Sequence, residues 1–210
     1  MARNIFRPDS GLMLTFGQIT DCIFLSLFYF LGCVPIVTAG ASWAALYDAS
    51  YRAFRKGDKH SWSRFLHTFK SNLRASLLPN LVFLGLFCLT AWGTIRLWNS
   101  AVAGTLSWAV FAGGAFAAVL VYGILSVLFP MLSRFENSTG ALLKNTVFLA
   151  MANLPRTLVL GVLNTACLLL CLRYIIPLFF LPSLSALIGS FFLEPMFKPY
   201  LPEETEPANP

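Results

Sequence analysis

The chain has 210 residues, of which 57% are hydrophobic and only 11% are charged, and its mean hydropathy is +0.71. An ordinary soluble domain is about 25% charged, so this composition excludes a water-soluble globule and predicts a single membrane domain over residues 1–201. The net charge of +6 does not indicate nucleic-acid binding, because the basic residues flank apolar runs, as the positive-inside rule predicts.

Five apolar runs have about the length that a membrane-spanning helix needs, roughly 20 residues for 30 Å of hydrocarbon. The sequence therefore predicts an all-α, polytopic membrane bundle with spans at residues 16–39, 75–95, 106–132, 154–172 and 174–193. The last two share one apolar stretch divided by Arg173, which indicates a tight hairpin. Residues 202–210 contain three glutamates and three prolines, and this tail is predicted to be disordered.

The region between the first two spans contains seven of the fifteen basic residues and is predicted to form cytoplasmic amphipathic helices. Over residues 61–74, apolar side chains repeat at helical spacing on one face and basic side chains cover the other, which is typical of a helix at a membrane surface. Residues 42–55 and 138–153 are interpreted in the same way. The residues expected at this cytoplasmic surface are Trp62, Arg64, Phe65, Phe69, Lys70, Arg74, Lys144 and Asn145.

The loop charges predict an orientation in the membrane. With residues 52–74 in the cytoplasm, eleven basic residues lie inside and four outside, which predicts an outside N-terminus and an inside C-terminus. Arg3 and Arg7 instead favour a cytoplasmic N-terminus. A re-entrant first run, which enters and leaves the membrane on the same side, would allow that position. Asp21 near the outer end of the first span and Glu194 at the inner end of the fifth are interpreted as carboxylates that reach the interface.

The third predicted span carries small residues at four-residue spacing. Small residues on one face of a helix allow two helix backbones to approach closely. This face packs either inside the protein or against another membrane protein, and both alternatives stay open. The residues of this candidate packing or partner interface are Ala109, Gly113, Gly114, Ala117 and Ala118.

Two parts of the chain show the same order of features, which suggests an internal repeat. Each runs from a span through a cytoplasmic amphipathic helix into another span, as in transporters that contain parallel repeats. The tripeptide 71–73 (SNL) precedes the second span and 152–154 (ANL) precedes the fourth, and an arginine closely follows each. Because the matching strings are short, chance similarity is the alternative explanation.

The sequence shows no catalytic or metal-binding constellation. His60 and His67 have no cysteine or carboxylate at ligand spacing, and no nucleotide-binding or hydrolase motif is present. The five cysteines lie inside apolar runs and are interpreted as small apolar side chains rather than disulfides or metal ligands. We therefore expect a protein that is not an enzyme and that binds no cofactor.

Several short strings, which occur in a fixed order, carry a resemblance to a known family. In chain order they are PIVTAGA (35–41), AALY (44–47), FxxxFKxN (65–72), LLKN (142–145) and NLP (153–155). Over residues 16–193 the chain resembles the YesL family of bacterial integral membrane proteins. Members of that family are often encoded beside carbohydrate ABC importers and polysaccharide-degrading enzymes.

The resemblance implies an accessory role in oligosaccharide uptake. The chain would be a non-enzymatic membrane subunit bound to the importer's permease subunits, with its cytoplasmic helices on the inner leaflet near the nucleotide-binding subunits. Membrane lipid is the other expected partner. Two alternatives stay open. A self-contained transporter or channel predicts solute flux in liposomes, and a membrane sensor or scaffold predicts that neutralising Arg64, Lys70 and Arg74 abolishes function.

Overall fold

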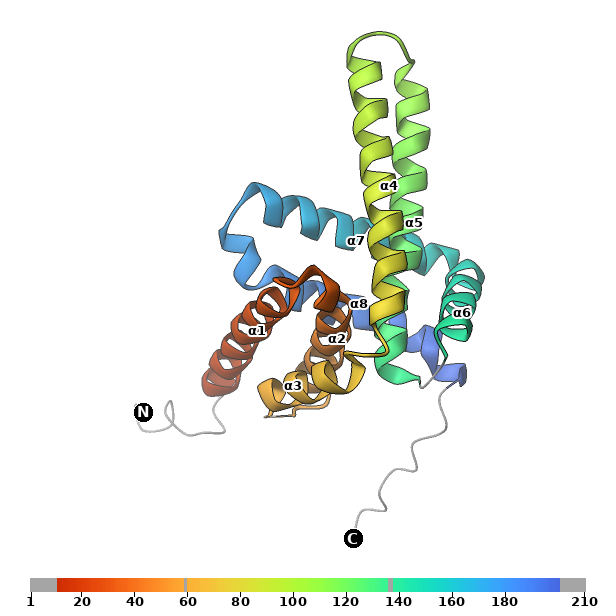
Figure 1. The fold of residues 1–210 in the computed structure, drawn as a ribbon. Coiled ribbons are helices and arrows are strands. Elements are labelled where there is room, and N and C mark those ends of the chain that lie inside the picture. The colour runs from red at the N-terminus through yellow and green to blue at the C-terminus, as the bar shows by residue number, and fades with distance from the viewer. Residues whose placement is uncertain (1–10, 59, 136–137, 201–210) are drawn as a thin grey trace.

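The computed structural model describes residues 11–58, 60–135 and 138–200, and every regular element in them is a helix (Figure 1). The predicted all-α fold is therefore confirmed. The elements are α1 (Gly11–Cys33), η2 (Ile36–Thr38), α2 (Ala39–Arg55), α3 (Ser61–Asn72), α4 (Leu77–Val102), α5 (Trp108–Arg134), α6 (Thr139–Ala152), α7 (Leu154–Arg173), η3 (Ile176–Phe179), α8 (Leu181–Phe197) and η4 (Lys198–Tyr200).

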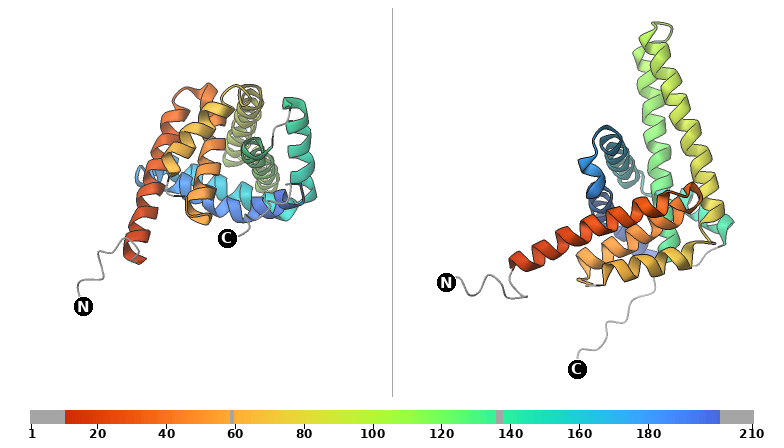
Figure 2. Two further views of the ribbon diagram at one scale, coloured as in Figure 1. Left: turned by 90° about the horizontal axis from the view of Figure 1, so that it is seen from below. Right: turned by 60° about the vertical axis from the view of Figure 1, so that its left-hand side comes forward.

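Three of the described helices, α4, α5 and α7, are long and apolar enough to cross a membrane. They overlap the predicted second, third and fourth spans, and they indicate a membrane protein. The side of the membrane on which each loop lies stays a prediction. The helices α4 and α5 form a hairpin whose outer half projects beyond the other helices, which surround its inner half (Figures 1 and 2).

The first and fifth predicted spans differ most from the helices observed there. The apolar run 16–39 does not form one helix, because α1 ends at Cys33 and the chain turns through η2 into α2. The run 174–193 begins with η3, and its regular helix α8 starts only at Leu181. Proline explains both differences, since Pro35, Pro177 and Pro182 lack a backbone N–H and favour helix starts and turns over helix interiors.

Asn80 of α4 holds the turn between α1 and α2. Its side-chain Nδ2 donates hydrogen bonds of 2.9 and 3.1 Å to the backbone carbonyls of Ile36 and Val37. The Asn80 side chain is completely buried. An amide is suited to this position because a single Nδ2 supplies two N–H donors.

Replacing Asn80 by aspartate is expected to destabilise the protein by about 3 kcal/mol, because the change keeps the shape of the side chain but removes both donors. A buried carboxylate would then face two carbonyl oxygens. Unfolding of the purified protein in detergent measures the effect, and Asn99→Asp on the exposed outer part of α4 is the matched control. Equal stability of the two variants would contradict this role for Asn80.

Helix α2 is the central helix of the fold rather than a surface helix. It packs against α1, α3, α5 and α8, and eleven of its residues are buried. This corrects the expectation that residues 42–55 lie at the membrane surface. The physical reason is the size of its side chains. The small residues Ala41, Ser42, Ala44, Ala45, Ala49 and Ser50 are buried and let neighbouring helices come close.

Part of the apolar face of α3 is covered by protein. Phe65 is 2% exposed, and its ring stacks on Phe28 of α1 at 5.9 Å between centroids. Ser61 at the start of α3 donates a hydrogen bond of 2.7 Å to the carboxylate of Asp21 in α1. The expected orientation puts Asp21 and Ser61 on opposite sides of the membrane, whereas in the structure they lie side by side.

An aromatic cluster joins α2 to α4 and α5. The rings of Trp43, Phe83 and Phe129 lie 5.2 to 5.6 Å apart between centroids. Gly40 at the start of α2 leaves room for them, since a methyl group there would lie 2.5 Å from the Phe129 ring and 3.1 Å from Asn80. Much of the hydrophobic core therefore lies at the inner half of the α4–α5 hairpin.

Helices α5 and α7 cross closely where Gly123 faces Gly161. A methyl group on Gly123 would overlap the backbone carbonyl oxygen of Thr157, and one on Gly161 would overlap that of Val119. The two glycines are also in mutual contact, with the Cα of Gly161 3.3 Å from the position of a methyl group on Gly123. The two backbones thus touch directly, as small residues permit in membrane proteins.

The structure supports the internal repeat suggested by the two Asn-Leu pairs. Asn72 and Asn153 each donate from Nδ2 to the carbonyl four residues earlier, at 2.9 and 3.2 Å. Each also accepts, at its backbone carbonyl, the N–H of a buried hydroxyl residue four positions later, Ser76 or Thr157. Equivalent positions of α3 and α6 are buried alike, as in the pair Phe65 and Thr146. The α3–α4 and α6–α7 elbows are therefore built in the same way.

Candidate functional site

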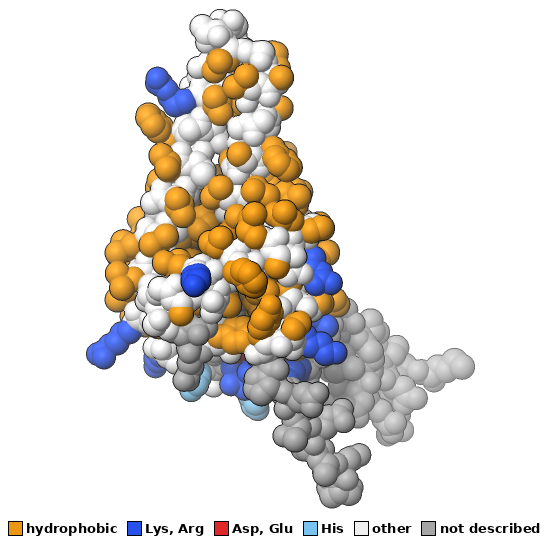
Figure 3. Space-filling view, turned by 90° about the vertical axis from the view of Figure 1, so that its right-hand side faces the viewer, with side chains coloured by type: hydrophobic (Ala, Val, Ile, Leu, Met, Phe, Trp, Pro, Cys, Tyr) orange, Lys and Arg blue, Asp and Glu red, His pale blue; other side chains and the backbone are white. Residues whose placement is uncertain are grey.

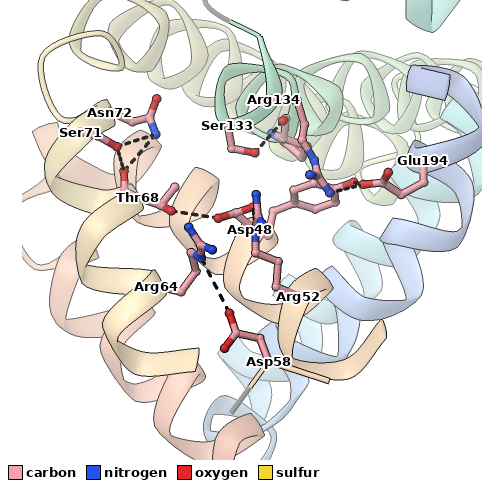
Figure 4. Close-up of polar contacts among 12 residues, drawn as sticks. Asp48, Arg52, Asp58, Arg64, Thr68, Ser71, Asn72, Ser133, Arg134 and Glu194 are labelled. Atoms are coloured by element: carbon pink, nitrogen blue, oxygen red, sulfur yellow. Dashed lines mark hydrogen bonds and ion pairs between the residues drawn. The ribbon is translucent and has the colours of Figure 1, made fainter. Parts of the chain in front are cut away.

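A cluster of charged side chains joins α2, α5 and α8 (Figure 4). Arg134 at the end of α5 forms an ion pair with Glu194 of α8, with 2.6 Å between Nη2 and Oε1. The two side chains are only 9% and 14% exposed. Tyr47 of α2 donates a hydrogen bond of 2.7 Å to the same carboxylate oxygen. Burial, together with the nearby Glu194 carboxylate, raises the pKa of Tyr47 well above its usual value, so its hydroxyl stays a donor at neutral pH.

Asp48 extends this cluster from α2 to α3. Its carboxylate accepts hydrogen bonds from Arg52 Nε at 2.9 Å and from Thr68 Oγ1 at 3.0 Å. The Asp48 side chain is only 5% exposed, and Thr68 is buried. Figure 4 shows Asp48 between α3 on one side and the Arg134–Glu194 pair on the other. The cluster therefore connects four helices at one end of the bundle.

Three cations surround the ring of Tyr51 on the edge of the cluster. Arg134, Arg55 and Lys56 lie 4.2, 5.4 and 5.8 Å from its centroid. Arg55 also lies 4.6 Å from the ring of Phe191 in α8. Cation–π contacts of this kind stabilise positive charge where it leaves water. The arrangement holds α2 on α8 and concentrates positive charge at this end of the molecule.

The charged cluster was not predicted as a unit. Glu194 was interpreted as a carboxylate that reaches the interface, but it is instead paired within the protein. An acidic residue in an apolar helix is a signal that a specific partner exists. The sequence could not identify that partner, because Arg134, Lys144 and Arg156 were all basic residues of the nearby cytoplasmic segments.

The residues expected at the cytoplasmic surface divide into two groups. Phe65 and Phe69 point into the protein and stack on each other at 6.2 Å between centroids. Trp62, Lys70, Arg74, Lys144 and Asn145 are exposed. Arg64 is half-buried and lies 3.9 Å from Asp58. The exposed members lie on α3, just after it, and on α6, and α3 and α6 are the two equivalent helices of the repeat.

The five small residues of α5 also divide into two groups. Gly114 packs on the Leu97 side chain of α4, and Gly114, Ala117 and Ala118 line a shallow cavity between the two helices. Ala109 and Gly113 are exposed, and nothing lies within 4 Å of the position of a methyl group on Gly113. One part of the predicted interface is thus used inside the hairpin and another part faces outward.

A cavity of about 100 Å³ lies among α1, α2, α5, α7 and α8. Its lining is uncharged, with aromatic, amide, hydroxyl and thiol groups. Residues that line it include Tyr29, Trp43, Tyr122, Asn164, Cys167 and Ser185. In the part of the chain that the structure describes, no three His, Cys, Asp or Glu side chains are grouped so that they could hold a metal ion.

One comparison with known proteins gives a match. The family described as "Protein of unknown function, DUF624" matches residues 21–94, which extend from α1 into α4. This stretch of the chain is similar to that family, and it contains the turn held by Asn80, the central helix α2 and the first elbow of the repeat. No curated protein and no solved structure matches the chain.

Proposed function

We propose that this chain is a non-enzymatic integral membrane subunit that acts by packing its α4–α5 hairpin against a partner membrane protein. The observation that carries the proposal is the projection of the outer half of the hairpin beyond the rest of the molecule (Figures 1 and 2). Apolar side chains on both helices point away from the hairpin, and Leu89, Trp92 and Phe116 are each at least 60% exposed. Such a surface lies in lipid or against protein, not in water.

The outward small residues of α5 are the proposed contact. Ala109 and Gly113 leave a strip of backbone uncovered, and a partner helix can approach such a strip more closely than it can approach large side chains. The partner that we propose is the permease of a bacterial carbohydrate ABC importer. This identity rests on the YesL resemblance, with the nucleotide-binding subunits near the basic residues of α3.

Replacing Gly113 by leucine is expected to reduce the amount of permease that copurifies in mild detergent by about tenfold, the effect of roughly 1.4 kcal/mol. The added side chain fills the outward strip and leaves the α4–α5 contact intact. Mass spectrometry of the copurified proteins measures the effect. Gly85→Leu on α4 is the matched control, because a methyl group there also has nothing within 4 Å.

Recovery of a lone monomer from cells that express the importer, with oligosaccharide uptake unaffected by deletion of the gene, would contradict the proposed function. Gly114→Leu provides a second comparison. Its side chain would push on Leu97 inside the hairpin, so it is expected to lower stability as well as partner binding, whereas Gly113→Leu affects binding alone.

The uncharged cavity favours a second candidate function, a self-contained transporter for a small neutral solute. Asn164 and Tyr122 on its wall carry polar groups of the kind that recognise such a solute. This alternative predicts solute flux in liposomes that contain only this protein, and Asn164→Leu should abolish that flux. Absence of flux together with copurified permease would favour the accessory subunit.

A further inference from the structure

The two elbow helices α3 and α6 are equivalent in the repeat, but their outward faces have opposite character. Their inward positions are buried alike, so the difference is confined to the exposed face. Exposed polar residues on α3 and just after it are His67, Lys70, Ser71 and Arg74, and their counterparts on α6 and at the start of α7 are Phe148, Met151, Ala152 and Pro155. Phe148 and Met151 are 67% and 50% exposed. This stretch of the α3 face is thus polar, whereas the matching stretch of α6 is apolar.

A groove of about 330 Å³ continues the apolar face of α6 toward α5 and η4. Most of its wall is apolar, and the amide of Asn145 and the hydroxyl of Tyr200 are its polar groups. The lining residues are Met131, Phe135, Asn145, Phe148, Leu149 and Tyr200. Figure 3 shows this side of the molecule, where apolar side chains gather and basic side chains lie around them.

Two lysines are close in sequence to residues that line the groove. Lys144 precedes Asn145 on α6, Lys198 lies two residues before Tyr200 on η4, and both lysines are exposed. Neither α6 nor η4 contains an acidic residue. The groove therefore combines an apolar wall and two hydrogen-bonding side chains with two exposed lysines that are close in sequence to its lining residues.

We propose that this groove binds one anionic phospholipid of the surrounding membrane. The acyl chain lies along Phe148, Leu149 and Met131, where each buried methylene group contributes to binding. The phosphate lies near Lys144 and Lys198, since basic side chains beside helices of membrane proteins attract anionic headgroups. This site is separate from the α4–α5 hairpin, and the proposal does not depend on the proposed function.

The occupant of the groove can be captured by replacing Phe148 with the photoreactive analogue benzoylphenylalanine. Phe148 is mostly exposed, so the larger ring is expected to leave the fold unchanged. After irradiation of cells that express the full chain, mass spectrometry should show an adduct enriched in phosphatidylglycerol. The same replacement at Phe116, on the outer half of the hairpin, should give adducts in the proportions of the bulk lipid. A protein adduct at position 148 would overturn the proposal.

The double variant K144Q/K198Q tests the headgroup contact. Fluorescently labelled phosphatidylglycerol is titrated into the delipidated protein in detergent. Because each lysine near an anionic headgroup contributes about fivefold, the double variant should bind phosphatidylglycerol roughly thirtyfold more weakly. Binding of phosphatidylcholine should be unchanged.

The matched control is Lys70→Gln, which removes a positive charge from the equivalent helix α3 and should leave lipid binding unchanged. Equal affinity of the native chain for the two lipids would overturn the proposal. A loss of phosphatidylglycerol binding in Lys70→Gln as large as that in the double variant would do the same. The elution volume in size-exclusion chromatography confirms that each variant is folded.

Discussion

Replacing Gly123 by alanine is expected to destabilise the protein by about 3 kcal/mol, although the change adds only a methyl group. The methyl group would overlap the carbonyl oxygen of Thr157 in α7. A backbone atom cannot rotate away as a side chain can, so α5 and α7 must separate. Their separation weakens every contact along the crossing, including the one between Gly123 and Gly161.

Whether Gly123→Ala lowers or raises the stability of the protein shows whether α5 and α7 are in close contact at this position. In an open helical position the same replacement stabilises a helix, by about 1 kcal/mol. Gly113→Ala, on the same helix with nothing within 4 Å, is therefore the control and should be neutral or stabilising. Reversible unfolding by SDS in mixed micelles measures both variants. If Gly123→Ala is as stable as Gly113→Ala, α5 and α7 do not cross at these glycines.

Replacing Glu194 by alanine is expected to cost about 3–5 kcal/mol of folding free energy. The buried guanidinium of Arg134 would lose its carboxylate, and the hydroxyl of Tyr47 would lose its acceptor. The cost comes from the charge that is left without a partner in a region that excludes water, more than from the strength of the ion pair itself.

The double variant R134L/E194L distinguishes these two contributions. It removes both charges together and is expected to be more stable than either single variant, since an apolar pair can replace a buried ion pair. Asp58→Ala is the control, because it breaks the more exposed contact to Arg64, which is worth about 0–1 kcal/mol. Equal stability of Asp58→Ala and Glu194→Ala would contradict a structural role for the buried pair.

The all-helical fold and its three long apolar helices could be predicted because length and apolar composition are local properties of a sequence. The division of the first and last apolar runs was harder to predict. Mean hydropathy is averaged over a whole run, so it does not show that a new helix begins near Pro35 or Pro182. For α2, Arg52 and Arg55 indicated a surface helix. Arg52 is instead paired with Asp48 of the same helix, Asp48 also binds Thr68 of α3, and Arg55 contacts Ser190 and Phe191 of α8, which are distant in sequence.

Gly114 of the predicted packing face contacts Leu97 of α4, but the backbone contact between α5 and α7 lies further along the helix, at Gly123. Its partner Gly161 lies between Thr157 and Thr165 at four-residue spacing in α7, a small-residue pattern that was not recognised in the sequence. The Arg134–Glu194 cluster was not predicted because its two charged residues are far apart in the sequence. Each residue is visible in the sequence as an isolated charge, and only the packing of α8 on α2 brings the two together.

The buried ion pair has a consequence for the order in which the protein is made. Arg134 and Glu194 are 60 residues apart, so α5 is synthesised well before its carboxylate partner exists. Until the ribosome has released α8, the nascent chain carries an arginine without its counter-ion at the end of a membrane helix. Final assembly therefore waits for the last helix. Chains that terminate before Glu194 keep the unpaired charge.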